Sequence, residues 1–288
     1  MTTYLNHSLK NNPSLKQSFF RLANETFQID LQAWEALGYW DDSYNVHCIE
    51  HNNEIIANVS TSEATLVLDH QLYRTKQIGT VMTARRYRQL GYAKSLMQHV
   101  LQENANADFI FLFANKQTAS FYQQFGFELV MQRKFTIQTN NISFKQTDIK
   151  KLDFKDEKTR LFIVDLLTHR LPVSSKLGVL RNEMIILFHI MTSWSEHLYY
   201  IPALKTMVIG KQEKGRFILA DFISKQPVLL KELLPFLNVS GDVIELGFTP
   251  SSLQKVESFE VIYDYFYVKN QCDIAFPSGY YFPDLGKA

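Results

Sequence analysis

The stretch that decides the fold reads Gly79-Thr-Val-Met-Thr-Ala-Arg-Arg-Tyr-Arg-Gln-Leu-Gly-Tyr-Ala-Lys-Ser-Leu-Met97. Its pattern predicts a strand that ends at Thr83 and a helix over 91–104, joined by a basic turn. The turn carries Arg88-x-x-Gly91-x-Ala93, and the two small residues leave room beside the backbone. Successive backbone N–H groups at the start of a helix attract anions. The stretch therefore predicts a strand–turn–helix unit that can hold a phosphate group.

The elements around this unit alternate between helices and strands. Before the turn, the periodicity predicts helices over 15–28 and 31–40 and strands over 45–50, 54–69 and 73–83. After the helix, it predicts a continuous apolar strand over 108–114, a short helix over 117–124 and a strand over 127–138. This order predicts an α/β fold, of the α+β kind with a mixed sheet.

A polar, aperiodic stretch over 139–153 separates this part of the chain from the rest. We therefore expect one domain over 1–140 and a second α/β domain over 150–288. In the second domain the pattern predicts helices over 156–167, 177–192 and 228–237, and strands over 198–211, 216–223, 243–248 and 263–269. The order strand, strand, helix, strand, strand echoes the first half and suggests a degenerate internal repeat. The equivalent turn, Ala220-Asp-Phe-Ile-Ser-Lys-Gln-Pro227, contains proline and no glycine, so we expect no phosphate loop there.

Two motifs in the first half, in the right order, resemble the GNAT superfamily of N-acetyltransferases. Thr83-Ala-Arg-Arg-Tyr-Arg-Gln-Leu-Gly-Tyr-Ala-Lys-Ser-Leu-Met97 is similar to that family's acetyl-CoA pyrophosphate loop. Phe111-Leu-Phe-Ala-Asn115, with Ala119, Phe121-Tyr122 and Gly126-Phe127, is similar to the family's next strand and helix. The resemblance covers about residues 15–138. It implies a GNAT fold followed by a second, GNAT-like domain without the loop.

The resemblance also implies site residues. The backbone at three positions would bind the acetyl carbonyl and the pantetheine arm: Val81, Met82 and Thr83. The amides of a second group would hold the pyrophosphate: Arg88, Gln89, Leu90, Gly91, Tyr92, Ala93 and Lys94. Asn115 would hold the pantetheine from the neighbouring strand. Tyr122 would contact the cofactor and act as the general acid that protonates the leaving thiolate.

The general base is less well defined by the sequence. Many relatives place a carboxylate on the strand before the loop, and the strand 73–83 has none. Glu63 on the preceding strand is the first choice, and the alternatives are the pair Asp41-Asp42, His70 or a chain of water molecules. A further alternative comes from resemblance to the enhanced-intracellular-survival branch, in which the C-terminal carboxylate enters the site. Here the chain printed above ends Phe282-Pro-Asp-Leu-Gly-Lys-Ala288, after an aromatic run.

The charge distribution agrees with a phosphate site. The formal net charge is +1, from 30 basic and 29 acidic residues, which argues against duplex DNA or an anionic membrane as a partner. Locally, no Asp or Glu lies between Asp69 and Glu103, whereas six basic residues lie there: Arg74, Lys76, Arg85, Arg86, Arg88 and Lys94. This strip suits a pyrophosphate and a ribose phosphate, although a solvated strand edge could have the same composition.

Two further groups of residues have open or structural interpretations. His47, Cys48 and His51 have a spacing that suits a metal, but a turn follows directly and no second Cys/His pair lies nearby in the sequence. We therefore expect no metal, and no thiol nucleophile at Cys48. Trp34, Tyr39 and Trp40 cluster where the acceptor-side helices of the family lie. They either belong to the core or form the wall of the acceptor pocket.

Taken together, these patterns predict an acetyl-CoA-dependent N-acetyltransferase that transfers the acetyl group directly to a small-molecule amine. The alternative is a non-catalytic acetyl-CoA-binding or sensing module. We expect no nucleic-acid or membrane partner; the second domain would complete the acceptor cleft or form the interface of a homodimer. Two cysteines, and apolar runs far shorter than the ~20 residues that span a bilayer, predict a cytoplasmic protein.

Overall fold

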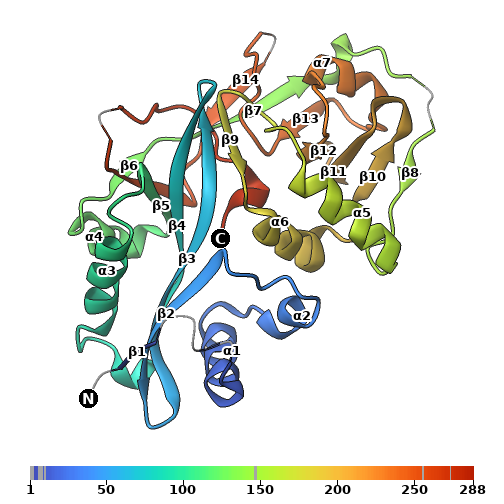
Figure 1. Ribbon diagram of the computed structural model, residues 1–288. Helices are drawn as coiled ribbons and strands as arrows, with labels where there is room; N and C mark the ends of the chain where they lie inside the picture. Colours follow the sequence, from blue (N-terminus) through green and yellow to red (C-terminus); the bar gives the residue numbers. More distant parts are fainter. Residues whose placement is uncertain (1–2, 6–8, 10, 146–147, 255, 273) are drawn as a thin grey trace.

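Two mixed β-sheets lie at the centre of the fold, and each draws strands from both halves of the sequence (Figure 1). The computed structural model describes residues 3–5, 9, 11–145, 148–254, 256–272 and 274–288. The first expected domain begins at residue 1, and residues 1–2 lie outside the described residues. The fold class predicted from the sequence is confirmed: the protein is an α/β protein with mixed sheets.

The first sheet has the strand order β1-β2-β3-β4-β5-β15-β6, and β9 lies beside β3. Its strands are β1 (Thr3–Leu5), β2 (Tyr44–His51), β3 (Glu54–Leu68), β4 (Gln71–Thr83), β5 (Phe109–Ala114), β6 (Glu128–Val130), β9 (Leu177–Leu180) and β15 (Tyr265–Asn270). The pair β4–β5 is parallel, and the other neighbours are antiparallel. The parallel pair frames the predicted phosphate loop.

The second sheet has the order β14-β7-β13-β12-β11-β10-β8. Its strands are β7 (Arg133–Gln138), β8 (Lys150–Lys151), β10 (Leu198–Ile201), β11 (Thr206–Glu213), β12 (Arg216–Ile223), β13 (Val243–Leu246) and β14 (Glu257–Glu260). Here β12 and β13 form the parallel pair. Each sheet thus contains one parallel pair joined by a helical crossover, as expected for a repeat.

The two halves exchange strands, so the sheets do not follow the predicted boundary near residue 140. The strand predicted over 127–138 is two strands: β6 pairs in the first sheet and β7 in the second. In return, β15 from the second half lies between β5 and β6. Gln132 anchors the crossing, because its Nε2 donates to Asp264 O (3.3 Å) and its Oε1 accepts from Phe282 N (3.0 Å).

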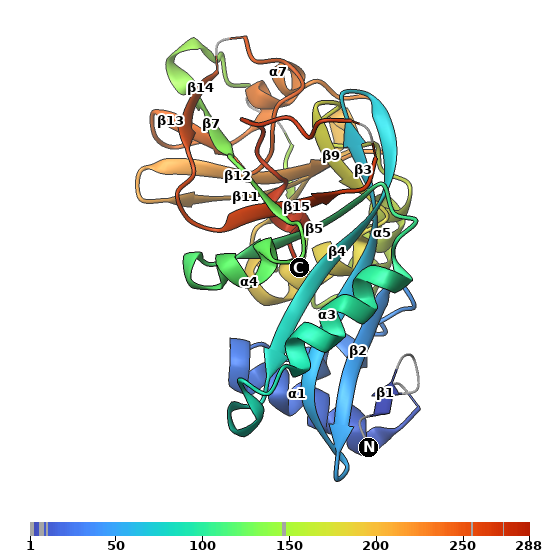
Figure 2. The same ribbon diagram turned by 90° about the vertical axis from the view of Figure 1, so that its left-hand side faces the viewer.

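The helices cover both faces of the first sheet and part of the second. They are α1 (Pro13–Phe27), α2 (Leu31–Ala36), α3 (Tyr92–Glu103), α4 (Ala119–Gln123), α5 (Glu157–Thr168), α6 (Glu183–His189) and α7 (Leu230–Leu233). Helices α1 and α2 lie on one side of the strands β2–β4, and α3 lies on the other (Figures 1 and 2). Among the described residues, no helix is both long and apolar enough to cross a membrane.

Three predicted helices are shorter or different in the structure. The helix expected over 31–40 ends at Ala36, because Gly38 turns the chain at φ +75°. The helix expected over 228–237 reduces to α7 and a 3₁₀ turn that contains Pro235. The helix expected over 177–192 begins as strand β9, whose Leu177 and Val179 are buried in a cluster with β3. Only the part from Glu183 onward is helical.

A shared apolar core joins the two halves, and it settles the role of the tryptophan cluster. Trp34, Tyr39 and Trp40 are all buried, with 2%, 7% and 8% of their surface exposed. The indole Nε1 of Trp34 donates to Met184 O (3.1 Å), and its ring meets Phe188 edge-on at 6.1 Å. These aromatic residues therefore belong to the core that fixes α2 to α6, and do not form a pocket wall.

Candidate functional site

A β-bulge interrupts β4 directly before the predicted loop. The register passes from Ser60 opposite Gly79 to Asn58 opposite Met82, so β4 has one additional residue. Thr80 adopts φ +42°, a conformation that L-residues rarely use. Such bulges redirect backbone groups and are frequent beside active sites. The three residues expected to bind the acetyl and pantetheine groups, Val81–Thr83, follow this bulge.

Buried polar side chains hold the bulge in place. The amide of Asn58 donates to Thr80 O (2.8 Å), and the Thr80 hydroxyl donates to Ser60 Oγ (2.7 Å). The Tyr44 hydroxyl lies 2.9 Å from Thr80 Oγ1. Asn58 and Ser60 are fully buried. The sequence analysis missed this network, although the polar residues within the long, largely apolar strand β3 were its signal.

The parallel strands diverge beyond the bulge. Their last paired residues are Ile78 and Leu112, yet β4 continues to Thr83 and β5 continues to Ala114. On its other side β5 remains paired with β15 as far as Ala114. The ends of β4 and β5 therefore open as a fork, the arrangement in which an extended ligand can lie along strand backbones.

The turn after β4 positions an open helix N-terminus. Gly91 precedes α3 with φ +83°, and no atom lies within 4 Å of the point where its Cβ would be. Within the described residues, no side chain caps the amides of this first turn, and the turn holds no acidic residue. It holds Lys94 instead, a cation at the positive end of the helix dipole. This combination favours a bound anion.

The positive strip predicted from the sequence divides in two. At one end, Lys76 pairs with Glu63 (2.6 Å) and Arg74 lies 3.7 Å from Asp108, so these charges are compensated. Around the turn, none of the described carboxylates forms an ion pair with Arg85, Arg88 or Lys94. The guanidinium Nε of Arg88 donates to Thr83 O (3.1 Å). Net positive charge therefore remains beside the open helix end.

Asn115 and Tyr122 follow β5, on the second side of the fork. Asn115 Oδ1 accepts from Thr118 N (3.1 Å) and caps the short 3₁₀ turn before α4. Tyr122 on α4 is only 7% exposed and packs in the cluster that contains Leu96 and Tyr267. Burial raises the pKa of the Tyr122 phenol to about 12. The phenol is therefore protonated at neutral pH and can donate a proton or a hydrogen bond.

The structure does not bring Glu63 to the other predicted residues. Glu63 lies opposite Lys76, and its side chain is 59% exposed and ion-paired with that lysine. Lys76 precedes Val81 by five residues on β4, which corresponds to roughly 16 Å along an extended strand. A carboxylate at that distance cannot reach an amine at the bulge. His70, another alternative, lies in the turn between β3 and β4, still farther along the strand.

The C-terminal residues do reach the bulged strand. A methyl group on Gly79 would lie 3.4 Å from Ala288 Cβ and 3.6 Å from the Ala288 carbonyl carbon. With its amide oriented to satisfy both neighbours, Gln77 donates to Gly286 O (3.0 Å) and accepts from Ala288 N (2.5 Å). Gln77 is buried, with 1% of its surface exposed. Ala288 is thus held against β4, next to the bulge.

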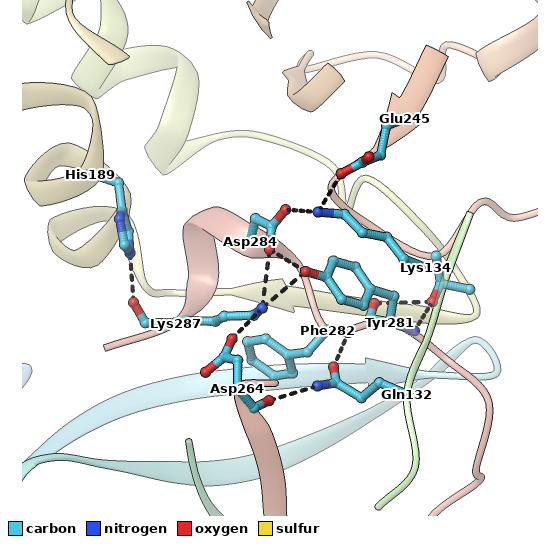
Figure 3. A network of polar contacts seen from close by, with 10 residues as sticks. Gln132, Lys134, His189, Glu245, Asp264, Tyr281, Phe282, Asp284 and Lys287 are labelled. Carbon is cyan, nitrogen blue, oxygen red and sulfur yellow. Dashed lines mark hydrogen bonds and ion pairs between the residues drawn. The ribbon is translucent and has the colours of Figure 1, made fainter. Parts of the chain in front are cut away.

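A network of charged side chains fixes this C-terminal segment (Figure 3). The ammonium of Lys287 donates to Asp264 (2.7 Å) and to Asp284 (3.0 Å). Lys134 on β7 lies 3.4 Å from Asp284 and 2.7 Å from Glu245 on β13. The backbone carbonyl of Lys287 also lies 2.6 Å from His189 Nε2. Because the partners come from four separate elements, sequence spacing gave no signal of this network.

The remaining sequence predictions concern His47, Cys48 and His51. Burial, with a smaller effect of the Glu50 carboxylate, raises the pKa of the Cys48 thiol to about 12, so a thiolate nucleophile at neutral pH is excluded. His47 and His51 are four residues apart on β2, roughly 13 Å in an extended strand, and cannot share one ion. A cavity of about 950 Å³ lies elsewhere, in the second half, and contains none of the predicted site residues.

Comparison with known proteins finds a family model that matches part of the chain. Residues 11–130 match the family model described as an acetyltransferase (GNAT) domain. No curated protein matches the chain by sequence. Among solved structures, a conserved protein of unknown function from Enterococcus faecalis V583, described as a probable N-acyltransferase, is 17% identical. It has a TM-score of 0.63 over 94% of this chain and 72% of that one.

Two further structures have the same extent of similarity. A GCN5-related N-acetyltransferase from Anabaena variabilis is 16% identical with a TM-score of 0.59, and Eis1 from Mycobacterium abscessus is 13% identical with a TM-score of 0.59. Each match covers 94% of this chain and 73% of the other. At these identities the similarity shows the fold, and it extends through both halves. Residues 11–130 therefore match the model of a GNAT acetyltransferase domain, and the chain as a whole has the fold of these structures.

Proposed function

We propose that the protein is an acetyl-CoA-dependent N-acetyltransferase that transfers the acetyl group directly to a small-molecule amine. The observation that carries this proposal is the open, uncapped N-terminus of α3 at Gly91, placed beside the fork between β4 and β5. The pyrophosphate would bind at the helix N-terminus, and the pantetheine arm would lie between the diverging ends of β4 and β5. We place the reaction in the cytoplasm, a reducing compartment in which Cys48 and Cys272 would remain free thiols.

The proposed roles follow from what each group can do. The backbone of Val81–Thr83 would hold the acetyl carbonyl and the pantetheine arm, and residues Arg88–Lys94 would hold the pyrophosphate. Attack by the amine forms a C–N bond and breaks the C–S bond, and the thiolate then takes a proton. Tyr122 would donate a hydrogen bond to this thiolate and so favour its protonation. With its pKa at about 12, above the ~8.5 of a typical thiol, Tyr122 would act mainly through a strong hydrogen bond to the developing thiolate.

The amine must lose a proton, and Glu63 lies too far away to accept it. In a polypeptide that ends at Ala288, the α-carboxylate lies against Gly79 beside the bulge. We propose this carboxylate as the acceptor. A chain extended by Gly-Ser after Ala288 tests the assignment, since the carboxylate is displaced and no residue is removed. We expect turnover to fall at least about tenfold with acetyl-CoA affinity unchanged; unchanged turnover would exclude the carboxylate.

The experiment that tests the function combines binding and turnover. Calorimetry with acetyl-CoA measures the affinity, and release of the CoA thiol in the presence of a panel of small amines measures transfer. Binding together with amine-dependent thiol release supports the proposal. Binding without transfer to any amine would instead support a sensing module. A protein that binds neither CoA nor acetyl-CoA would show that only the fold is shared.

A further inference from the structure

We propose that His47, His99 and Glu103 form a binding site for one divalent transition-metal ion of the zinc class. His47 lies on β2, and the other two residues lie one turn apart near the end of α3. One ligand atom from each residue can be chosen so that all three lie within 4.8 Å of one another. Two imidazoles and a carboxylate are a donor set that Zn²⁺ uses in proteins.

The distances within the cluster already approach those of a metal site. His47 Nδ1 lies 3.4 Å from Glu103 Oε2, and His99 Nε2 lies 3.2 Å from Glu103 Oε1. A tetrahedral ion with bonds of about 2.0–2.1 Å keeps its ligand atoms roughly 3.3 Å apart. The two separations involve different oxygens of Glu103, so each imidazole already faces one oxygen of the same carboxylate at the spacing of a metal site. Binding through a single oxygen would draw the three ligand atoms together from their present separation of up to 4.8 Å.

The surroundings of His47 orient it for this role. Thr61 Oγ1 lies 3.4 Å from His47 Nε2, and both residues are buried, with 2% and 4% of their surfaces exposed. A hydroxyl that accepts from Nε2–H leaves the lone pair of Nδ1 directed toward Glu103. Metal-bound imidazoles usually have such a partner on the second ring nitrogen. His99 and Glu103 are one-third or more exposed, which provides an entry path and room for a water ligand.

The electrostatics of α3 also favour a cation at this position. Glu103 is the last residue of α3, and the last turn contains no basic residue. A carboxylate there adds to the negative end of the helix dipole, and a cation compensates both. The opposite end of the same helix lacks acidic residues and suits an anion. The twelve residues of α3 span about 18 Å, so the ion would clamp the helix to β2 far from the proposed acetyl-CoA site.

In the sequence, the residues with metal-like spacing near His47 were Cys48 and His51, and no metal was expected there. His51 is at the exposed end of β2, whereas His99 and Glu103 come from a helix about fifty residues away in the chain. Without a metal, the three side chains would form a cluster held by protons shared between imidazole and carboxylate. The two possibilities differ in stoichiometric metal binding, which does not depend on acetyltransferase activity.

The test uses the full chain, purified without a polyhistidine tag and freed of metal by a chelator. Calorimetry with Zn²⁺ should show one ion bound per chain, and Co²⁺ should give the visible absorption of a four-coordinate site. Zn²⁺ should also raise the melting temperature. His99→Ala and Glu103→Gln should each weaken Zn²⁺ binding at least about tenfold. Both side chains are partly exposed, so we expect both variants to fold.

The chain provides matched controls. Asp165 in the last turn of α5 and His169, directly after this helix, form a similar pair at 3.1 Å. Among the described residues this pair belongs to no cluster that could hold a metal ion, so His169→Ala should leave Zn²⁺ binding unchanged. His51→Ala should also bind as the wild type does. The proposal is overturned if the wild-type chain binds no Zn²⁺ at one-to-one stoichiometry, if His99→Ala binds as tightly as the wild type, or if His51→Ala abolishes binding.

Discussion

The units β4–α3–β5 and β12–α7–β13 have the same topology, but the N-termini of their helices differ. In both, four residue pairs join the parallel strands, and a strand from the other half of the chain lies antiparallel beside the last strand. In the first unit, Gly91 opens a twelve-residue helix whose first turn has no capping side chain. In the second, a four-residue helix follows Pro227, and Glu232 Oε2 accepts from Leu229 N (3.0 Å).

This difference teaches where an anion site comes from. In the second unit the protein's own carboxylate occupies the helix end, so the amide there is already satisfied. In the first unit the amides and Lys94 are left for a ligand. The adjoining cavity of the second unit is lined largely by apolar side chains such as Phe222 and Phe248. The topology is thus shared, and the two units differ in whether the helix N-terminus is already capped by a carboxylate of the protein.

The largest expected effect comes from placing a carboxylate at the first unit's open end. Gly91→Asp should lower acetyl-CoA affinity at least about 100-fold, equivalent to losing two charge-assisted hydrogen bonds. Gly215→Asp is the matched control: Gly215 has φ +80° and equally open space, in the hairpin between β11 and β12. Calorimetry measures both. Retained affinity in Gly91→Asp, or an equal loss in Gly215→Asp, would remove the loop from the proposed site.

Tyr122 lies on α4, which follows β5, and a substitution there tests the proposed role in protonation of the thiolate. Tyr122→Phe should lower turnover at least about tenfold while acetyl-CoA affinity stays near the wild-type value, because only the proton donor is lost. Tyr267→Phe is the control, since this buried tyrosine lies in the same cluster with its ring centre 6.4 Å away. Steady-state thiol release gives kcat and KM for both variants. Equal turnover of Tyr122→Phe and wild type would exclude the proposed role.

Asp284 forms ion pairs with Lys287 and with Lys134 on β7. Burial opposes ionisation of Asp284, but the ammonium groups of Lys287 and Lys134 outweigh it and hold the pKa of this carboxyl below its ordinary value. The ionised carboxylate therefore stabilises the fold above its unfolded-state pKa near 4, and this contribution is lost as the pH falls further. Asp284→Asn should lower the free energy of unfolding by about 2 kcal/mol at pH 7.

Urea unfolding at pH 7 and pH 3 measures this effect. The difference in the free energy of unfolding between wild type and Asp284→Asn should narrow at pH 3, because this carboxyl is then protonated in the unfolded chain and its ionisation on folding costs free energy. Asp165→Asn, an exposed residue paired with Lys225, should have little effect at either pH. If the difference in the free energy of unfolding is the same at both pH values, the ionised carboxylate of Asp284 does not stabilise the fold.

We expect no change in acetyl-CoA binding when the helix N-terminus of the second unit is altered. Calorimetry should give one acetyl-CoA per wild-type chain. Pro227→Gly combined with Glu232→Gln should leave that stoichiometry and affinity unchanged. The substitutions free the helix end, but α7 has only four residues and its first-turn carboxylate is replaced by no cation. A second equivalent of bound acetyl-CoA, in the wild type or in this variant, would show that the two units are functionally alike.

Local features of the sequence were enough to predict the first unit. Apolar alternation and glycine positions placed β3, β4, α3 and β5 within two or three residues of their observed bounds. These elements are governed by contacts between near neighbours in the chain, so their signal is local. By contrast, the stretch 127–138 reads as one strand because both of its parts have strand-like residues. Only their partners, β15 and β13, show that it divides between two sheets.

From the sequence alone, a strand, a glycine turn and a basic helix start can be predicted in this order, because these features depend on backbone conformation within about twenty residues. The anion site proposed there rests on them. The tertiary structure alone decided that Ala288, and not Glu63, lies beside the bulge of β4. It also decided that the neighbours of His47 are His99 and Glu103 of α3, and not His51. These groupings arise from strand exchange and packing between distant segments, and such long-range contacts leave no periodic pattern in the residues that make them.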